Sequence, residues 1–159
     1  MARNRLETKT LPTISGLGAS VFTYTYDTAD NVASVTAPAT NNAAGPRDRR
    51  TTYRYDALHR LTLETRPAPG GLSTHAAPTT AFTSDDAGNK ASVTDPIGRV
   101  TTYAYDAANR LVTVTAPPVQ SGGPPTVTMY GYDLSDNLTK VQDAVNGDDD
   151  VVSEDRKST

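Results

Sequence analysis

The sequence predicts an all-β protein built of tandem antiparallel β-hairpins, and three features of the 159-residue chain predict it. Its eight tyrosines occur only as four Tyr-x-Tyr pairs, and aspartate follows each pair directly. Its 25 threonines favour extended strands over helices. No window keeps a 3.6-residue apolar period, so we expect no substantial helix.

The composition limits the classes of protein that the chain can belong to. Leu, Ile, Val and Phe number 27 of 159 residues, so much of the apolar area must come from tyrosine rings. The net charge of −3 argues against a nucleic-acid binder, which normally has a basic stripe. Without cysteine there is neither a disulfide nor a thiolate metal site. We expect no membrane span, because no stretch approaches about 18 apolar residues, and no signal peptide, because the first ten residues have no apolar core.

Five copies of one repeat share a common register. Four copies begin with Tyr-x-Tyr-Asp, and a degraded fifth copy reads Phe-Thr-Ser-Asp. Three residues after each aspartate stands a residue that readily adopts a positive φ, followed by Asn or Arg. The residues that define the repeat are therefore Tyr24, Tyr26, Asp27, Tyr53, Tyr55, Asp56, Phe82, Asp85, Gly88, Tyr103, Tyr105, Asp106, Asn109, Tyr130, Tyr132 and Asp133.

Each part of the repeat has a physical role in a hairpin. Tyr-x-Tyr places two rings on one face of a first strand, because side chains alternate along a strand. The aspartate accepts hydrogen bonds from amides of the bend. The positive-φ residue suits a type I turn closed by a bulge. A second strand such as 111–115 then runs back, and a proline ends it in four of the five copies. We expect the tyrosine hydroxyls to reach partners on neighbouring strands.

The repeats organise residues 1–145, and we expect an acidic, disordered tail over 146–159. A partial repeat covers 1–23, and full repeats start near residues 24, 53, 82, 103 and 130. Residues 4–12 align without a gap with residues 109–117, so we expect both ends to be cut from a longer array. Inserts rich in Ala, Pro and Gly, at 39–46, 67–78 and 117–125, are predicted to be surface loops.

The segments 103–111 and 95–99 resemble the RHS/YD repeat, and the resemblance extends over about residues 1–145. That family includes bacterial rearrangement-hotspot proteins, insecticidal toxin-complex shells and the teneurins. The resemblance implies a curved strip or partial shell of hairpins that encloses or presents a polymorphic toxin in intercellular competition. The implied partners are the remaining repeats of the parent shell and its C-terminal toxin. The implied parent is secreted or lies at the cell surface, and we expect self-association through exposed sheet edges.

Two other functions stay open on the sequence alone. The tyrosines and the inserts could form a module that binds carbohydrates or cell surfaces, because aromatic rings pack against sugar rings. The chain could also belong to an enzyme whose site lies in a longer parent. A structural role with no catalytic residue, metal or cofactor is the reading that the repeat register favours.

The remaining candidate sites are weak. His59 occupies the positive-φ position of its repeat, and His75 lies in an insert. The segment 143–154 has the length of an EF-hand loop but no oxygen ligand at its third and fifth positions. Residues 95–98 resemble part of a self-cleaving segment of the family, but another Tyr-x-Tyr unit follows, so we interpret them as an ordinary connection. Arg47, Arg49 and Arg50 are predicted to be a solvated basic cluster in a loop.

Overall fold

In the computed structural model, residues 5–11, 20–38, 49–69, 75–120, 122–145 and 148–152 are described, and they contain β strands and no α-helix. The strands are β1 (Thr8–Leu11), β2 (Ser20–Tyr26), β3 (Val32–Thr36), β4 (Arg50–Tyr55), β5 (Leu61–Thr65), β6 (Thr79–Ser84), β7 (Lys90–Thr94), β8 (Val100–Tyr105), β9 (Leu111–Ala116), β10 (Thr126–Tyr132), β11 (Leu138–Val145) and β12 (Asp148–Val152). In this part of the chain no helix is long and apolar enough to cross a membrane.

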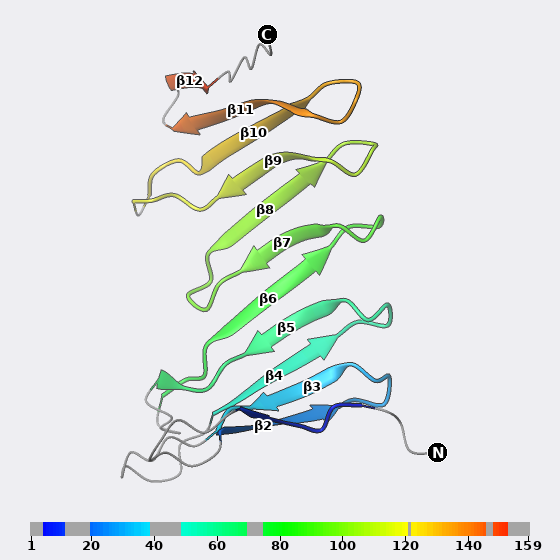
Figure 1. Cartoon of the computed structure of the whole chain (residues 1–159). Coiled ribbons are helices and arrows are strands. Elements are labelled where there is room, and N and C mark those ends of the chain that lie inside the picture. The colour runs from blue at the N-terminus through cyan, green and yellow to red at the C-terminus, as the bar shows by residue number, and fades with distance from the viewer. Residues whose placement is uncertain are drawn as a thin grey trace. The chain divides into compact units, whose positions relative to one another are not determined.

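The chain divides into two compact units, Met1–Ala81 and Phe82–Thr159. The boundary between the units falls within β6. In each unit the order of hydrogen-bonded strands follows their order along the chain. In each unit the hairpin bends lie at one end of the strands and the connections between hairpins at the other (Figure 1). The predicted all-β class and its tandem antiparallel hairpins are therefore confirmed.

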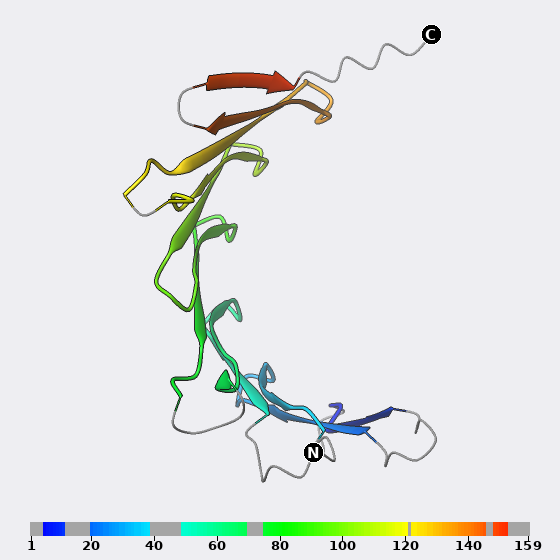
Figure 2. The same ribbon diagram turned by 90° about the vertical axis from the view of Figure 1, so that its left-hand side faces the viewer.

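Each unit is a single layer of strands. Figure 2 shows the strands of each unit edge to edge with no second layer against them. Among the side chains that the structure describes, no hydrophobic residue is buried, and only Ser34, at 6% exposure, is buried at all. Stability must therefore come from contacts between neighbouring strands, as in other repeat proteins, and not from a central core.

The two faces of the layer differ in chemistry. Directly opposed residues of neighbouring strands share a face, and successive residues of one strand alternate between faces. Tyr24 lies opposite Val35, while the next residue, Thr25, lies opposite Ser34. The same alternation places Tyr53 on one face and Thr52 on the other. One face therefore carries the tyrosine rings, and the other carries residues such as Thr25, Ser34 and Thr52.

The C-terminal segment differs from the expectation. Asp148–Val152 form β12, which pairs antiparallel with β11, where the sequence predicted a disordered tail. Pairing satisfies backbone groups that an unpaired edge of β11 would leave open. Residues 146–147 and 153–159 lie outside the described residues.

Candidate functional site at the hairpin bends

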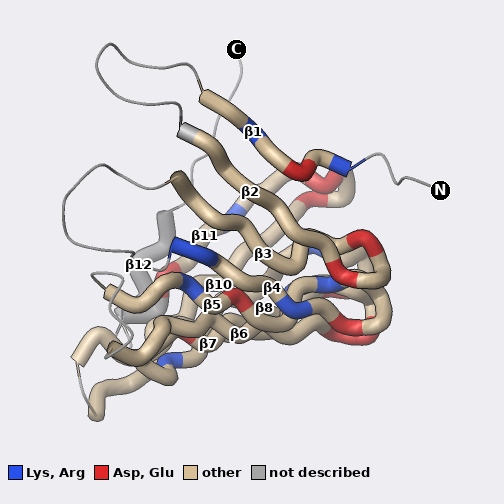
Figure 3. Tube along the Cα trace, turned by 90° about the horizontal axis from the view of Figure 1, so that it is seen from below, with Lys and Arg blue, Asp and Glu red and all other residues tan. Residues whose placement is uncertain are grey.

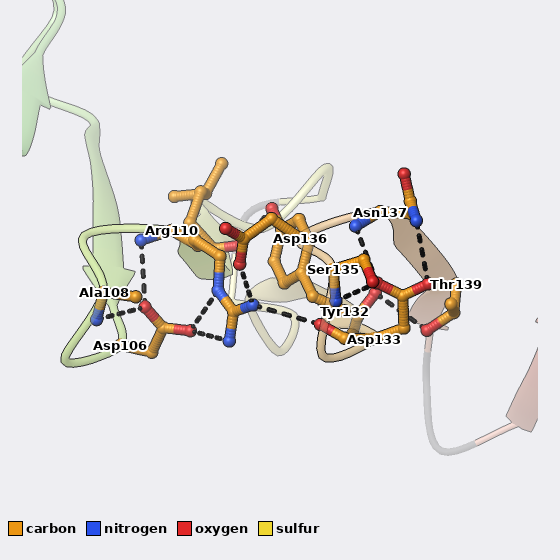
Figure 4. Close-up of polar contacts among 11 residues, drawn as sticks. Asp106, Ala108, Arg110, Tyr132, Asp133, Ser135, Asp136, Asn137 and Thr139 are labelled. Atoms are coloured by element: carbon orange, nitrogen blue, oxygen red, sulfur yellow. Dashed lines mark hydrogen bonds and ion pairs between the residues drawn. The ribbon is translucent and has the colours of Figure 1, made fainter.

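The bend of the β8–β9 hairpin shows how the repeat's aspartate is used. The backbone N–H of Asp106 donates to the Arg110 carbonyl at 3.0 Å, and that of Asn109 donates to the Asp106 carbonyl at 3.0 Å. Oδ1 of Asp106 accepts the backbone N–H groups of Ala108 and Arg110, both at 2.9 Å. Nε of Arg110 donates to Oδ2 at 2.7 Å (Figure 4). One carboxylate thus holds the whole five-residue bend.

The predicted positive-φ position is confirmed in all five repeats. The first to fifth bend residues are counted here from the aspartate, so the positive-φ residue is the fourth. Its φ is 67° at Asp30, 62° at His59, 91° at Gly88, 60° at Asn109 and 65° at Asp136. His59 therefore serves the bend, and its Nδ1 lies 2.8 Å from Oδ1 of Asn31.

The fifth bend residue, Asn or Arg, has a role that the sequence did not reveal. In every repeat its side chain donates to Oδ2 of the bend's own aspartate. The nitrogen–oxygen distances are 2.9 Å for Asn31–Asp27, 2.7 Å for Arg60–Asp56, 3.1 Å for Asn89–Asp85, 2.7 Å for Arg110–Asp106 and 2.9 Å for Asn137–Asp133. This contact needs a side chain with a hydrogen-bond donor, which Asn and Arg both supply as N–H groups.

A sixth bend of the same kind joins β7 to β8, at the other end of the strands. Ile97 and Arg99 donate their backbone N–H groups to Oδ1 of Asp95 at 3.0 and 2.9 Å, and Arg99 Nε donates to Oδ2 at 2.6 Å. Gly98 is the positive-φ residue, at 84°. The sequence predicted an ordinary connection here. Its Asp-x-x-Gly-Arg spacing, which matches the other bends, was the signal that identifies it.

Hydrogen bonds lower the pKa of the bend aspartates Asp27, Asp56, Asp106 and Asp133. At the bends closed by asparagine, the Asn31 side chain lowers the pKa of Asp27, and the Asn137 side chain lowers that of Asp133. The cause is the same in both: donors that favour the charged carboxylate.

The bends closed by arginine behave alike. The backbone N–H of Arg60 lowers the pKa of Asp56, and that of Arg110 lowers the pKa of Asp106, with a further contribution from each guanidinium. Figure 3, with acidic residues red and basic residues blue, shows both signs of charge together at the hairpin bends. At each hairpin bend the carboxylate is therefore held by a donor of its own bend, a guanidinium at Asp56 and Asp106 and an amide at the other three.

The second tyrosine of a pair joins its hairpin to the preceding one, as predicted. The hydroxyl of Tyr26 donates to the Leu6 carbonyl at 2.7 Å, and that of Tyr132 donates to the Leu111 carbonyl at 2.9 Å. The Tyr55 hydroxyl makes the equivalent bond to the carbonyl of Val32, at 3.1 Å. Partial burial raises the pKa of the Tyr55 phenol.

The first tyrosine of each pair lies directly opposite a residue of the returning strand of its own hairpin. The opposed residues are Tyr24–Val35, Tyr53–Glu64, Tyr103–Val114 and Tyr130–Val141. Partial burial raises the pKa of Tyr53, and likewise that of Tyr105, a second ring. In the degraded repeat, Lys90 Nζ lies 5.9 Å from the centre of the Phe82 ring.

On the opposite face, threonine and serine form rows that the sequence analysis did not foresee. In the first unit the row runs through directly opposed residues: Thr25, Ser34, Thr52, Thr65 and Thr79. In the second unit it runs through Thr83, Ser92, Thr102 and Thr115. The hydroxyl oxygens of Thr25 and Ser34 lie 2.7 Å apart, as do those of Thr83 and Ser92. These rows contain seven of the 25 threonines of the chain.

Other sequence candidates gather into no site. Within the described ranges, no three His, Asp or Glu residues are placed to hold a metal ion. Arg49 Nη1 donates to the Pro38 carbonyl at 2.8 Å, while Arg47 lies outside the described residues, as do parts of the EF-hand-like segment 143–154. The polar groups of the repeats are therefore used to hold hairpins together, which defines a β-hairpin repeat protein.

Comparison with known families identifies the kind of repeat. The family model described as "RHS Repeat" matches residues 43–70, over the β4–β5 hairpin, and residues 85–117, from the Asp85 bend through β9. These two segments therefore match the RHS repeat, as the resemblance of the sequence indicated. A comparison with curated proteins finds no match.

Solved structures similar to this chain include the crystal structures of TcdB2-TccC3-Cdc42 and of TcdB2-TccC3. The sequences are 15% and 16% identical to this chain, and each match covers 91% of it with a TM-score of 0.39. The matches cover 10% and 11% of those chains, so this chain spans about a tenth of their length.

Proposed function

We propose that the chain is a non-catalytic structural segment of an RHS/YD-repeat protein, a part of the β-wall that encloses or presents a polymorphic toxin in intercellular competition. One observation carries the proposal: the repeat's defining groups are engaged within the array. Each bend carboxylate accepts hydrogen bonds from its own bend, as at Asp106, and second tyrosines donate to the preceding hairpin.

The single-layer architecture supports the same role. Among its described residues the layer buries no hydrophobic side chain. Such a layer covers a large surface area with few residues. That property suits a wall better than a catalytic pocket, which is normally concave and lined by convergent groups. In this proposal the partners are further repeats of the parent protein and its toxin, and the parent is secreted or lies at the cell surface.

The test is to read the locus and then examine the full protein that it encodes. We expect further in-frame repeats and a toxin domain with an adjacent immunity gene. In limited proteolysis of the purified full-length protein, the toxin domain should resist cleavage until the repeats are denatured. A toxin domain that is cleaved as fast as its isolated form would contradict enclosure.

A module that binds carbohydrates is the alternative, and a glycan array separates the two. The hydroxyls of Tyr26, Tyr55 and Tyr132 are already donated to backbone carbonyls, which favours the structural role. We expect no glycan binding by the chain. Binding that Tyr103→Ala abolishes while the far-ultraviolet circular dichroism spectrum is retained would favour the alternative.

A further inference from the structure

Within each unit, the bends of consecutive hairpins touch through one recurring pair of positions. The fifth bend residue of one hairpin contacts the fourth, positive-φ residue of the next. We call these contacts the bend ladder. Its rungs are an ion pair between Arg5 and Asp30, and the pairs Asn31 Oδ1–His59 Nδ1 at 2.8 Å, Asn89 Nδ2–Asn109 Oδ1 at 2.9 Å and Arg110 Nη1–Asp136 Oδ1 at 2.6 Å.

The residue types in the rungs are matched in charge. Both arginine rungs end on an aspartate, Asp30 or Asp136, whereas both asparagine rungs end on a residue without a carboxylate, His59 or Asn109.

The geometry of the fifth residue explains the match. Arg110 binds its own Asp106 through Nε, so its Nη1 is left to bind Asp136 of the next hairpin (Figure 4). Its guanidinium carbon also lies 4.9 Å from the centre of the Tyr132 ring. One cation thus lies between two carboxylates. With asparagine in its place, those two carboxylates would have no cation to offset their repulsion.

The neutral rung uses the same positions without a charge. Asn89 Nδ2 donates to Oδ2 of its own Asp85 at 3.1 Å and to Oδ1 of Asn109 at 2.9 Å. Its two N–H groups thus replace the guanidinium. An arginine there would bring a positive charge with only one carboxylate to neutralise it.

We propose that the bend ladder selects which hairpins can lie side by side. An arginine at the fifth position requires an acidic fourth residue in the next hairpin, and an asparagine requires a fourth residue without a negative charge. The ladder is thus an interaction surface whose partner is a hairpin of matching bend charge. This proposal concerns recognition between repeats and holds whether or not the array encloses a toxin.

The test is a double-mutant cycle at Arg110 and Asp136 in the full chain. Arg110→Asn and Asp136→Asn each place a residue that other bends already have at that position, and together they rebuild the rung of Asn89 with Asn109. We expect each single variant to raise the unfolding equilibrium constant. If the two effects were independent, the double variant would raise the unfolding equilibrium constant by the product of the two single effects. We expect a rise about two- to fivefold smaller than that product, which is the size of a coupling between exposed charges. The coupling should fall toward unity at about 1 M salt.

The reciprocal cycle converts a neutral rung into an ionic one, with Asn89→Arg and Asn109→Asp. We expect a coupling of the same size that appears with the new charges and weakens with salt. Arg110→Asn combined with Asp30→Asn, which belong to different rungs, is the matched control and should be additive. Additivity in the two rung cycles, or coupling that salt leaves unchanged, would overturn the proposal. If an Arg110 or Asp136 variant fails to fold, the reciprocal cycle decides alone.

Discussion

At the scale of single residues, the fourth bend position is the clearest backbone constraint in the chain. Four of its five occupants are non-glycine residues held at a φ between 60° and 67°. Asn, Asp and His adopt this conformation more readily than other side chains. The constraint thus explains the narrow choice of residues at this position.

Substitution of Gly88 tests that constraint. A Cβ at Gly88 would meet no atom within 4 Å, so a loss of stability must come from its φ of 91°. We expect Gly88→Ala to lower the free energy of unfolding by about 1–2 kcal/mol, and Gly88→Val to lower it further. Gly88→Asn, which copies Asn109, should cost least. Urea denaturation measures the series, and an equal effect of all three variants would refute the explanation.

The bend aspartate is the second residue-scale feature that can be tested. Asp106→Ala removes three hydrogen-bond acceptor contacts at once and leaves two backbone N–H groups without their partner. We expect a clear fall in the urea midpoint of unfolding. Asp86→Ala, at the exposed second position of a neighbouring bend, is the control and should change the midpoint little. Equal midpoints for the two variants would show that the carboxylate does not hold the bend.

At the scale of elements, neighbouring hairpins are joined by the second tyrosines Tyr26, Tyr55 and Tyr132. Tyr132→Phe keeps the ring over Arg110 but removes the hydrogen bond to the Leu111 carbonyl. We expect a loss of about 0.5–1.5 kcal/mol in the free energy of unfolding. Tyr130→Phe, in the same strand, is the matched control with a smaller expected loss. A larger loss from the Tyr130 variant would contradict the assignment.

Sequence predicted the hairpins because their determinants are local. The aspartate, the positive-φ residue and the Tyr-x-Tyr strand lie within a few residues of one another. Interactions between residues so close in the chain can be predicted from the sequence. The rungs could not be predicted, because Asn31 and His59 are 28 residues apart and Asn89 and Asn109 are 20 apart. Their pairing depends on how connections of different lengths set the register between hairpins.

The threonine rows and β12 escaped prediction for related reasons. Which hydroxyl faces which depends on the strand register, as with Thr52 and Thr65, and the composition alone does not give it. Three consecutive aspartates indicated a solvated tail, but the segment pairs with β11 through backbone groups that any residue other than proline supplies. Backbone pairing thus outweighed the unfavourable strand propensity of aspartate.

At the scale of the whole molecule, the bends should make stability depend on acid pH. Hydrogen bonds lower the pKa of Asp27, Asp56, Asp106 and Asp133 below the ordinary value of 3.8. Their contribution is therefore fully present well above pH 3.8 and is lost as the pH falls through the lower folded values. We expect the urea midpoint to be flat from pH 7 to about 5 and to fall below about pH 4. A midpoint that rises as the pH falls below 4 would contradict this sign.

The edge strand β1 leads to a prediction about assembly. It is the outermost strand of the first unit, and all four of its residues are exposed. Because unpaired strand edges are templates for association, we expect the isolated chain to self-associate with increasing concentration. Thr8→Lys with Thr10→Lys should weaken association more than Ala57→Lys with Ala87→Lys, which adds the same charge at the bends. Light scattering measures both, and a monomer at every concentration would contradict the expectation.

The absence of a buried hydrophobic side chain in the described layer has a consequence for how such a chain can change over generations. A protein organised around one interior must readjust many positions whenever a segment is copied or deleted. Here a duplicated hairpin has to suit only the two ribbons on either side of it. Gene segments could therefore recombine at the boundaries between hairpins and still encode a foldable product.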